Sequence, residues 1–234
     1  SQYDFNKNKN PCIVTEYLAN GTLKDIINLE KKGLCRDDWD DTLKLINIYG
    51  IASAMAFLHS HEVIHRDLKP ENILMNEYLF PKIADFGLSK IKENISESII
   101  ETSKFIGTPI YAAPEIYENK YCKASDVYAF AMIVYEIVTV QQPYQGYDAF
   151  RLVDDVMKGK RPNLDGIPDS YKNLIEFCWQ QDPSDRPTFE QIVKKIKKDH
   201  GFITELVDEV KFEDYVDYID NCRKFFKSDK FESI

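Results

Sequence analysis

The residues whose types and spacing could do chemistry lie in one short part of the chain. Residues 65–72 read His-Arg-Asp-Leu-Lys-Pro-Glu-Asn, and residues 85–87 read Asp-Phe-Gly after a strand-like run. A carboxylate such as Asp67 could orient and deprotonate an attacking hydroxyl, while Asn72 and Asp85 could hold magnesium on phosphates. In this order and this close together, the two motifs predict phosphoryl transfer from ATP to a protein hydroxyl.

The specificity of this signal comes from the pair of motifs and not from either one. A lone His-Arg-Asp is common, and a lone Asp-Phe-Gly is more often a turn than a metal site. Here Asn72 comes five residues after Asp67, and Asp85 comes thirteen residues after Asn72. With both motifs at this spacing, the chain resembles the eukaryotic protein kinases over roughly residues 11–199.

The resemblance implies a role for each polar residue near the two motifs. Asp67 would be the catalytic base, Lys69 would contact the transferred phosphate, and Thr108 would form a hydrogen bond near both. Asn72 and Asp85 would each hold a magnesium ion, so ATP and Mg2+ are the implied cofactors. The physical demand is electrostatic, because charge on the transferring phosphoryl group must be met by fixed cations.

The resemblance also implies a nucleotide pocket. Thr15 would be the gatekeeper, and Glu16 and Leu18 would lie in the hinge. Thr22 and Asp25 would lie near the ribose, and Leu74 and Ala84 would form the floor of the pocket. The backbone of the two hinge residues would meet adenine. Taken without the family, residues 15–18 are only the end of a strand, so these assignments depend on the resemblance.

Two features indicate which amino acid would accept the phosphoryl group and which group of kinases the chain resembles. Lys69 lies two residues after Asp67, which is typical of the Ser/Thr kinases and not of the tyrosine kinases. Cys178-Trp179 and the run Arg-Pro-Thr-Phe at 186–189 are typical of tyrosine kinases and of the tyrosine-kinase-like group. The chain therefore looks most like a tyrosine-kinase-like Ser/Thr kinase, whose partner would be a protein substrate with a Ser/Thr acceptor.

Other positions resemble structural parts of the same family. The run 107–115 looks like the end of an activation segment, and its Glu115 would form a buried pair with Arg186. Alone, either residue would be read as a solvated charge. Asp126 resembles the helix aspartate that braces the backbone of the catalytic loop.

The resemblance implies an α+β, protein-kinase-like fold, in which a mostly α-helical large lobe accompanies a hinge strand and small β-hairpins. The residues themselves predict a strand over 12–17 and a hairpin that pairs 73–75 with 82–84. Apolar patterns, caps and proline boundaries predict helices over 22–32, 40–59, 124–140, 149–158, 171–180 and 188–199.

The composition changes after Gly201. Residues 203–226 are rich in acidic side chains, and their spaced apolar positions are Leu206, Val210, Tyr215, Ile219 and Phe226. This pattern predicts one or two amphipathic helices outside the main core. We expect residues 1–200 to form a partial kinase domain of hinge and large lobe, and residues 201–234 to form an acidic helical extension.

The parts that should precede the motifs are not in the sequence. The nine glycines include no Gly-x-Gly, no Val-Ala-x-Lys precedes the hinge, and the first residue is not Met. We therefore expect most of the small lobe to be absent, the chain to be a piece of a longer kinase, and these residues alone to be inactive. The alternative is an inactive, truncated lobe that serves as a protein-interaction module.

The composition narrows the partners and the compartment. A net charge of −9 argues against nucleic acid, because phosphate binding favours a basic surface. Five scattered cysteines without metal-ligand spacing indicate reduced thiols in a cytoplasmic protein. The longest strongly apolar run, residues 127–135, is shorter than the ~20 residues that a membrane span needs. Residues 1–10 show no secretory signal.

Overall fold

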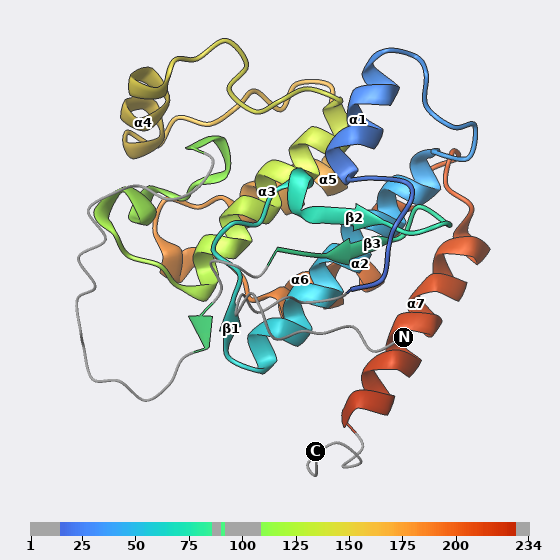
Figure 1. The fold of residues 1–234 in the computed structure, drawn as a ribbon. Coiled ribbons are helices and arrows are strands. Elements are labelled where there is room, and N and C mark those ends of the chain that lie inside the picture. The colour runs from blue at the N-terminus through green and yellow to red at the C-terminus, as the bar shows by residue number, and fades with distance from the viewer. Residues whose placement is uncertain (1–14, 86–89, 92–108, 228–234) are drawn as a thin grey trace, which may run out of the picture.

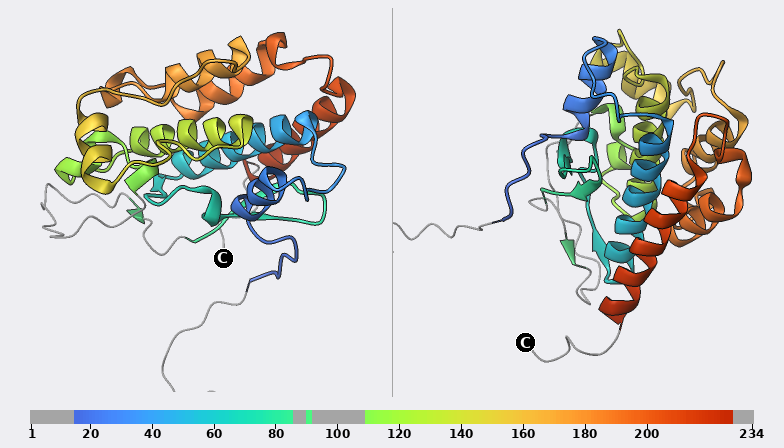
Figure 2. Two further views of the ribbon diagram at one scale, coloured as in Figure 1. Left: turned by 90° about the horizontal axis from the view of Figure 1, so that it is seen from above. Right: turned by 90° about the vertical axis from the view of Figure 1, so that its right-hand side faces the viewer.

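The computed structural model describes residues 15–85, 90–91 and 109–227. Two long helices, α2 (Asp41–Ser60) and α3 (Lys123–Thr139), form its middle layer. Figure 2 shows this layer between α5 and α6 on one side and α1 with the β2–β3 hairpin on the other. Both middle helices are apolar on most sides, which is why they are buried on most sides.

The outer helices follow the sequence prediction closely. Their bounds are α1 Leu23–Lys31, α4 Ala149–Met157, α5 Asp169–Cys178 and α6 Phe189–Lys198. Short 3-10 helices cover Pro70–Asn72, Pro109–Tyr111, Pro114–Glu118, Pro183–Asp185 and His200–Phe202. Every predicted helix before residue 200 is confirmed to within two residues at each end.

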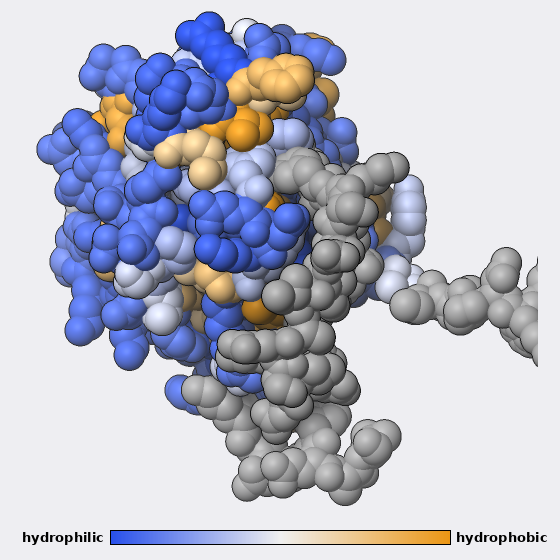
Figure 3. Space-filling model, turned by 90° about the vertical axis from the view of Figure 1, so that its left-hand side faces the viewer, coloured by the Kyte–Doolittle hydropathy of each residue, from blue (hydrophilic) through white to orange (hydrophobic). Residues whose placement is uncertain are grey.

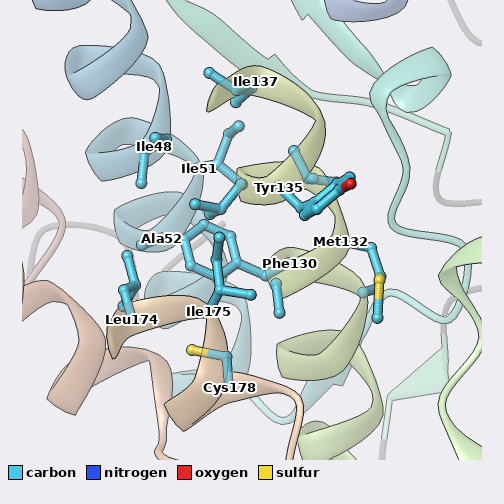
Figure 4. Packing of buried hydrophobic residues seen from close by; sticks show 14 of the residues in the cluster. Ile48, Ile51, Ala52, Phe130, Met132, Tyr135, Ile137, Leu174, Ile175 and Cys178 are labelled. Carbon is cyan, nitrogen blue, oxygen red and sulfur yellow. The ribbon is translucent and has the colours of Figure 1, made fainter. Parts of the chain in front are cut away.

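The core is built where these helices meet. Figure 4 shows side chains from three of them pointing toward one another, Ile51 from α2, Phe130 from α3 and Ile175 from α5. Cys178 closes the same cluster, and its burial raises the pKa of the thiol well above the ordinary value. The cysteines in the described part of the chain, Cys35, Cys122, Cys178 and Cys222, are free thiols.

The strands are short and form two antiparallel pairs, β1 (Val63–Ile64) with β4 (Lys90–Ile91) and β2 (Ile73–Met75) with β3 (Pro81–Ile83). The predicted hairpin is confirmed, with its second strand one residue earlier than expected. The β2–β3 hairpin lies against α2 (Figure 1). Since side chains alternate along a strand, Ile73 and Met75 are buried on the face toward α2, where Pro81, the strand partner of Met75, lies beside Gly50, and Leu74 is on the other face.

The strand predicted over residues 12–17 is wrong in the part that the structure describes. Residues 15–17 have no regular secondary structure, and residues 12–14 lie outside the described range. A strand exists by pairing its backbone groups with a neighbour. Within the described ranges no strand pairs with residues 15–17.

The C-terminal helix α7 (Glu209–Lys227) packs alongside α2 (Figure 2). Its Phe212, Tyr215 and Val216 belong to the main core, so the prediction of a helix outside that core is wrong. Of the predicted apolar positions, Tyr215 is in the core and Ile219 packs against it, whereas Leu206 and Val210 are 73% and 68% exposed. The buried face of α7 therefore combines Tyr215 and Ile219 with the unpredicted Phe212 and Val216.

The surface and the helix lengths bear on membrane contact. Figure 3 shows a largely hydrophilic face with scattered apolar residues. No helix in the described part of the chain is long and apolar enough to span a membrane.

Candidate active site

The catalytic loop converges on one carboxylate. Lys69 Nζ lies 2.6 Å from Asp67 Oδ2, and Asn72 Nδ2 donates to the same oxygen at 3.0 Å. Asn72 Nδ2 also donates to the Asp67 backbone carbonyl at 2.8 Å. The loop runs from β1 into the 3-10 helix Pro70–Asn72, whose first proline suits a helix start. The structure therefore brings together three of the predicted site residues.

A buried aspartate on α3 stabilises the backbone of this loop. Asp126, which is 2% exposed, accepts hydrogen bonds from the backbone amides of His65 at 2.9 Å and Arg66 at 3.0 Å. The predicted brace is confirmed. His59 Nε2 on α2 donates to the same carboxylate at 2.9 Å, a contact that the sequence reasoning missed. The loop conformation needs support, because Arg66 has a φ of 72°, which is unfavourable for a residue with a side chain.

Asp85 follows the end of β3, where the backbone of Ala84 contacts Asn72 and His65 of the loop. The amide of Ala84 donates to the Asn72 carbonyl at 2.9 Å, and His65 Nε2 donates to the Ala84 carbonyl at 3.0 Å. Asp85 follows directly, with an exposed side chain and a φ of 60°. Two non-glycine residues with positive φ thus flank the candidate site, and such strain persists only where the surroundings impose it.

The donor set fits magnesium. The Asn72 amide nitrogen faces Asp67, because the backbone carbonyl it contacts can only accept, so its side-chain oxygen is the atom left to meet a cation. Among the described residues, no group of three or more His, Cys, Asp or Glu side chains could hold a metal by itself. Mg2+ commonly takes only one or two protein ligands and completes its shell with phosphate and water. Asn72 and Asp85 could serve as such a pair.

The predicted pair of Glu115 and Arg186 is confirmed. The guanidinium makes two parallel contacts with the carboxylate, at 2.7 and 2.8 Å, and the Arg186 side chain is fully buried. Ser125 Oγ adds a hydrogen bond to Glu115 at 2.7 Å. This pair joins the segment after residue 109 to the loop before α6 with bidentate geometry.

The ribose-side and floor residues also lie together. The backbone of Thr22 bridges to Leu74, and the amide of Met75 donates to the Gly21 carbonyl at 2.9 Å. Thr22 and Asp25 are engaged with each other in a capping box at the start of α1, with Asp25 Oδ2 accepting from the Thr22 amide and hydroxyl. Leu74 and Ala84 are half-buried on the outer side of the hairpin.

The remaining predicted residues are less well placed. Thr15 and Glu16 are exposed and Leu18 is half-buried, and Glu16 forms an ion pair with Lys82 of β3. That pair brings the predicted hinge beside the hairpin. Thr108, like Phe86 of the Asp-Phe-Gly motif, lies outside the described residues.

One buried charge network was not predicted. Glu136 of α3 is 1% exposed and is bridged by Lys24 of α1 and by the Tyr111 hydroxyl, the latter at 2.6 Å. Burial, and then the charge of Glu136, raise the pKa of Tyr111 well above its ordinary value. The available signal was a glutamate inside an otherwise apolar helix, since a buried charge needs partners.

Comparisons with known proteins show the family of the chain. The model of the protein tyrosine and serine/threonine kinase family matches residues 3–196, and the chain belongs to this family. It is 35% identical over 191 residues to a putative serine/threonine-protein kinase/receptor of Acanthamoeba polyphaga mimivirus, covering 80% of this chain and 11% of that protein.

Two further relatives come from other organisms. A probable serine/threonine-protein kinase of Dictyostelium discoideum is 37% identical, with 80% of this chain and 14% of that protein covered. A serine/threonine-protein kinase of Arabidopsis thaliana is 33% identical, with 89% of this chain and 35% of that protein covered. The chain thus spans about a third or less of the length of these three relatives.

Proposed function

We propose that this chain supplies the phosphoryl-transfer half of the active site of a Ser/Thr protein kinase of the tyrosine-kinase-like group. The observation that carries the proposal is the convergence of Lys69 and Asn72 on Asp67, with Ala84, the residue before Asp85, hydrogen-bonded to the Asn72 carbonyl. In this proposal residues 1–200 are the partial kinase domain, with hinge and large lobe, and residues 201–234 are its C-terminal extension.

Each residue of the loop would have a distinct task in transfer. Asp67 would accept a hydrogen bond from the substrate hydroxyl and take its proton as the new bond forms. Lys69, held 2.6 Å from Asp67, would keep a positive charge next to the transferred group. Asn72 and Asp85 would hold magnesium, and bound Mg2+ and ATP would provide the phosphoryl group and neutralise its charge.

The nucleotide would lie over the outer face of the β2–β3 hairpin. Leu74 and Ala84 would form its apolar floor, and their half-buried side chains support this role. Thr22 and Asp25 would meet the ribose; the capping box uses Oδ2 of Asp25 and leaves Oδ1 for a ribose hydroxyl.

We propose the remaining predicted roles on the family resemblance. In this proposal Thr15 is the gatekeeper, and the backbones of Glu16 and Leu18 meet adenine. The hydroxyl of Thr108 forms a hydrogen bond near Asp67 and Lys69.

The partner would be a protein that presents a serine or threonine. Lys69, two residues after Asp67, supports this acceptor, and the three relatives described above carry serine/threonine-protein kinase in their names. We propose a cytoplasmic location and no nucleic-acid partner, supported by the free thiols and by the net charge of −9.

The test is transfer of labelled γ-phosphate by the protein isolated from its native source, with analysis of which amino acid is labelled. We expect phosphoserine and phosphothreonine, and a loss of at least about 10²-fold in Asp67→Asn and Asp85→Asn variants of that protein. The exposed Asp214→Asn is the matched control. Labelled tyrosine would contradict the acceptor, and a folded protein without transfer would favour the alternative of an interaction module.

A further inference from the structure

A pocket of about 410 Å³ lies behind the catalytic loop, at the junction of α2, α3 and the start of α6. We call it the α2–α3 pocket. Its lining includes none of the residues proposed above for ATP, magnesium or the acceptor, so it goes beyond the proposed function. One contact connects it to the loop, because His59 in its wall donates to Asp126, which also holds the loop backbone.

The pocket exists because the helices present small side chains where they meet. Ala56 on α2 and Ala124 and Val127 on α3 line it together. Residues three apart on a helix share one face, so both α3 side chains are on the pocket side. Pro183 and Phe189, from the segment that leads into α6, form further apolar walls. The volume is toward the lower end of the range for small-molecule sites, which suits a ligand of roughly one or two fused rings.

The wall of the pocket carries a polar atom that points to a ligand. His59 is 8% exposed and lines the pocket. Its Nε2 donates to Asp126, whereas its Nδ1 has no hydrogen-bond partner among the described residues. Nδ1 is not one of the unpaired atoms that the fold closes off from solvent, so a molecule in the pocket can reach it. Polar groups of buried side chains are nearly always paired, and a polar atom of a bound molecule would pair with this one.

The chemistry of His59 requires the ligand to be a donor. The carboxylate of Asp126 can only accept, so the proton of the neutral imidazole is on Nε2 and Nδ1 is left as an acceptor. A ligand with an N–H or O–H group satisfies it, whereas an ether or a carbonyl does not.

The rest of the lining indicates an uncharged aromatic ligand. Its charged side chains are engaged with others, and the pairs are Lys123 with Glu62, Arg186 with Glu115, and Glu190 with Arg223. Phe189 gives the pocket an aromatic wall, with its ring edge-on to His59 at a centroid distance of 5.1 Å. We propose that the α2–α3 pocket binds a small aromatic molecule with an N–H or O–H donor, which pairs with His59 Nδ1.

The test compares the affinities of indole and benzofuran for residues 1–234 at about pH 8, where a histidine ring is ordinarily neutral. The two probes have nearly the same shape, but benzofuran has an ether oxygen where indole has its N–H. We expect indole to bind roughly two- to tenfold more tightly, the usual gain from one hydrogen bond. In His59→Met this ratio should fall to about one. That variant leaves Asp126 its two backbone donors and should remain folded, which its thermal unfolding checks.

A second variant locates the bound probe. Ala124 is half-buried in the first turn of α3, and Ala124→Met should fill part of the pocket and weaken binding of both probes by about tenfold or more. The matched control is Ala149→Met, at an exposed alanine in the first turn of α4, which should change neither affinity.

Three results would each overturn the proposal. They are equal affinity for indole and benzofuran, a ratio that His59→Met does not alter, and binding that Ala124→Met leaves unchanged. If either variant fails to fold, the 15N resonance of His59 Nδ1 in the parent chain decides. Indole should shift this resonance and benzofuran should not, and a resonance that indole leaves in place would also overturn the proposal.

Discussion

The two ends of the candidate site are supported very differently. The catalytic loop, residues 65–72, rests on the buried Asp126, which accepts three hydrogen bonds. The predicted hinge, residues 15–18, has no regular secondary structure, and the ion pair that joins it to β3 is formed by Glu16 and Lys82 at 57% and 45% side-chain exposure. The proposed phosphate end is part of the helical core, while the proposed adenine end lies on its surface.

This difference separates two requirements of catalysis. Residues that act on the transferred group must be held in place before the reaction, because preorganised charges stabilise the transition state without further rearrangement. Residues 65–72, to which we assign this role, are held in place within this chain. Residues that bind adenine contribute affinity, and the residues proposed for this role at 15–18 have little support in the described part of the chain. We therefore expect a preformed transfer site with weak nucleotide binding.

The largest effect should come from breaking the buried pair behind the phosphate end. Arg186→Met leaves Glu115 buried without its partner, and we expect a loss of about 3–5 kcal/mol in the free energy of unfolding, measured in urea. The double variant Arg186→Met/Glu115→Leu, which removes both charges, should recover part of this loss. A loss below about 1 kcal/mol in the single variant would mean that the pair does not support this end.

Asp126→Asn tests the brace itself. In the variant, the side-chain NH2 group of Asn replaces one of the two carboxylate oxygens. This group cannot accept a hydrogen bond, so the backbone N–H of either His65 or Arg66 would lose its acceptor. We expect a loss of about 1–3 kcal/mol in the free energy of unfolding and faster hydrogen exchange at one of these two amides. Asp214→Asn, on the exposed side of α7, should change stability by less than about 0.5 kcal/mol. Unchanged exchange at both amides would contradict the bracing role.

Gly50→Ala tests whether α7 is tightly packed against α2, as the catalytic loop is against α3. In an open helix this change stabilises by about 0.5–1 kcal/mol. Here the added methyl group would overlap Tyr215, so we expect a net loss of about 1–3 kcal/mol, measured by thermal unfolding. Tyr215→Phe, which removes the overlapping hydroxyl, should recover part of the loss when it is combined with Gly50→Ala. Stabilisation by Gly50→Ala would show that α7 is loosely attached.

The smallest effect should come from the hinge side. Glu16→Gln removes an exposed ion pair with Lys82, and such pairs contribute about 0–1 kcal/mol. We expect a change in unfolding free energy at the lower limit of detection, and none at high salt, where exposed charges are screened. A loss as large as that of Asp126→Asn would remove the contrast between the two ends.

Much of this arrangement could be predicted because it depends on local patterns. The apolar runs of α2 and α3, the Thr22 cap and the motif spacing that gathers Asp67, Lys69 and Asn72 are all visible along the chain. The Glu115–Arg186 pair was also predicted, from the two motifs that contain these residues.

The errors concern features that depend on distant partners. The strand over 15–17 failed because strand formation needs a neighbouring strand, which a run of apolar residues does not reveal. The position of α7 failed because α2 offers Gly50 and Tyr49 to Phe212 and Tyr215, a match that only the folded arrangement shows. The ion pair between Lys24 and Glu136 was not predicted, because these residues are far apart in the sequence and meet only in the folded chain.

The most direct test of the contrast between the two ends is a transfer assay with purified residues 1–234. The assay measures labelled phosphate moved from ATP to Ser/Thr peptides, with Asp85→Ala as the control. The sequence has no Gly-x-Gly loop to cover the phosphates, and loss of one preorganised contact can reduce a rate by about 10²–10³-fold. We predict transfer at the background level, equal in the parent chain and in Asp85→Ala. Robust transfer that Asp85→Ala abolishes would contradict the account.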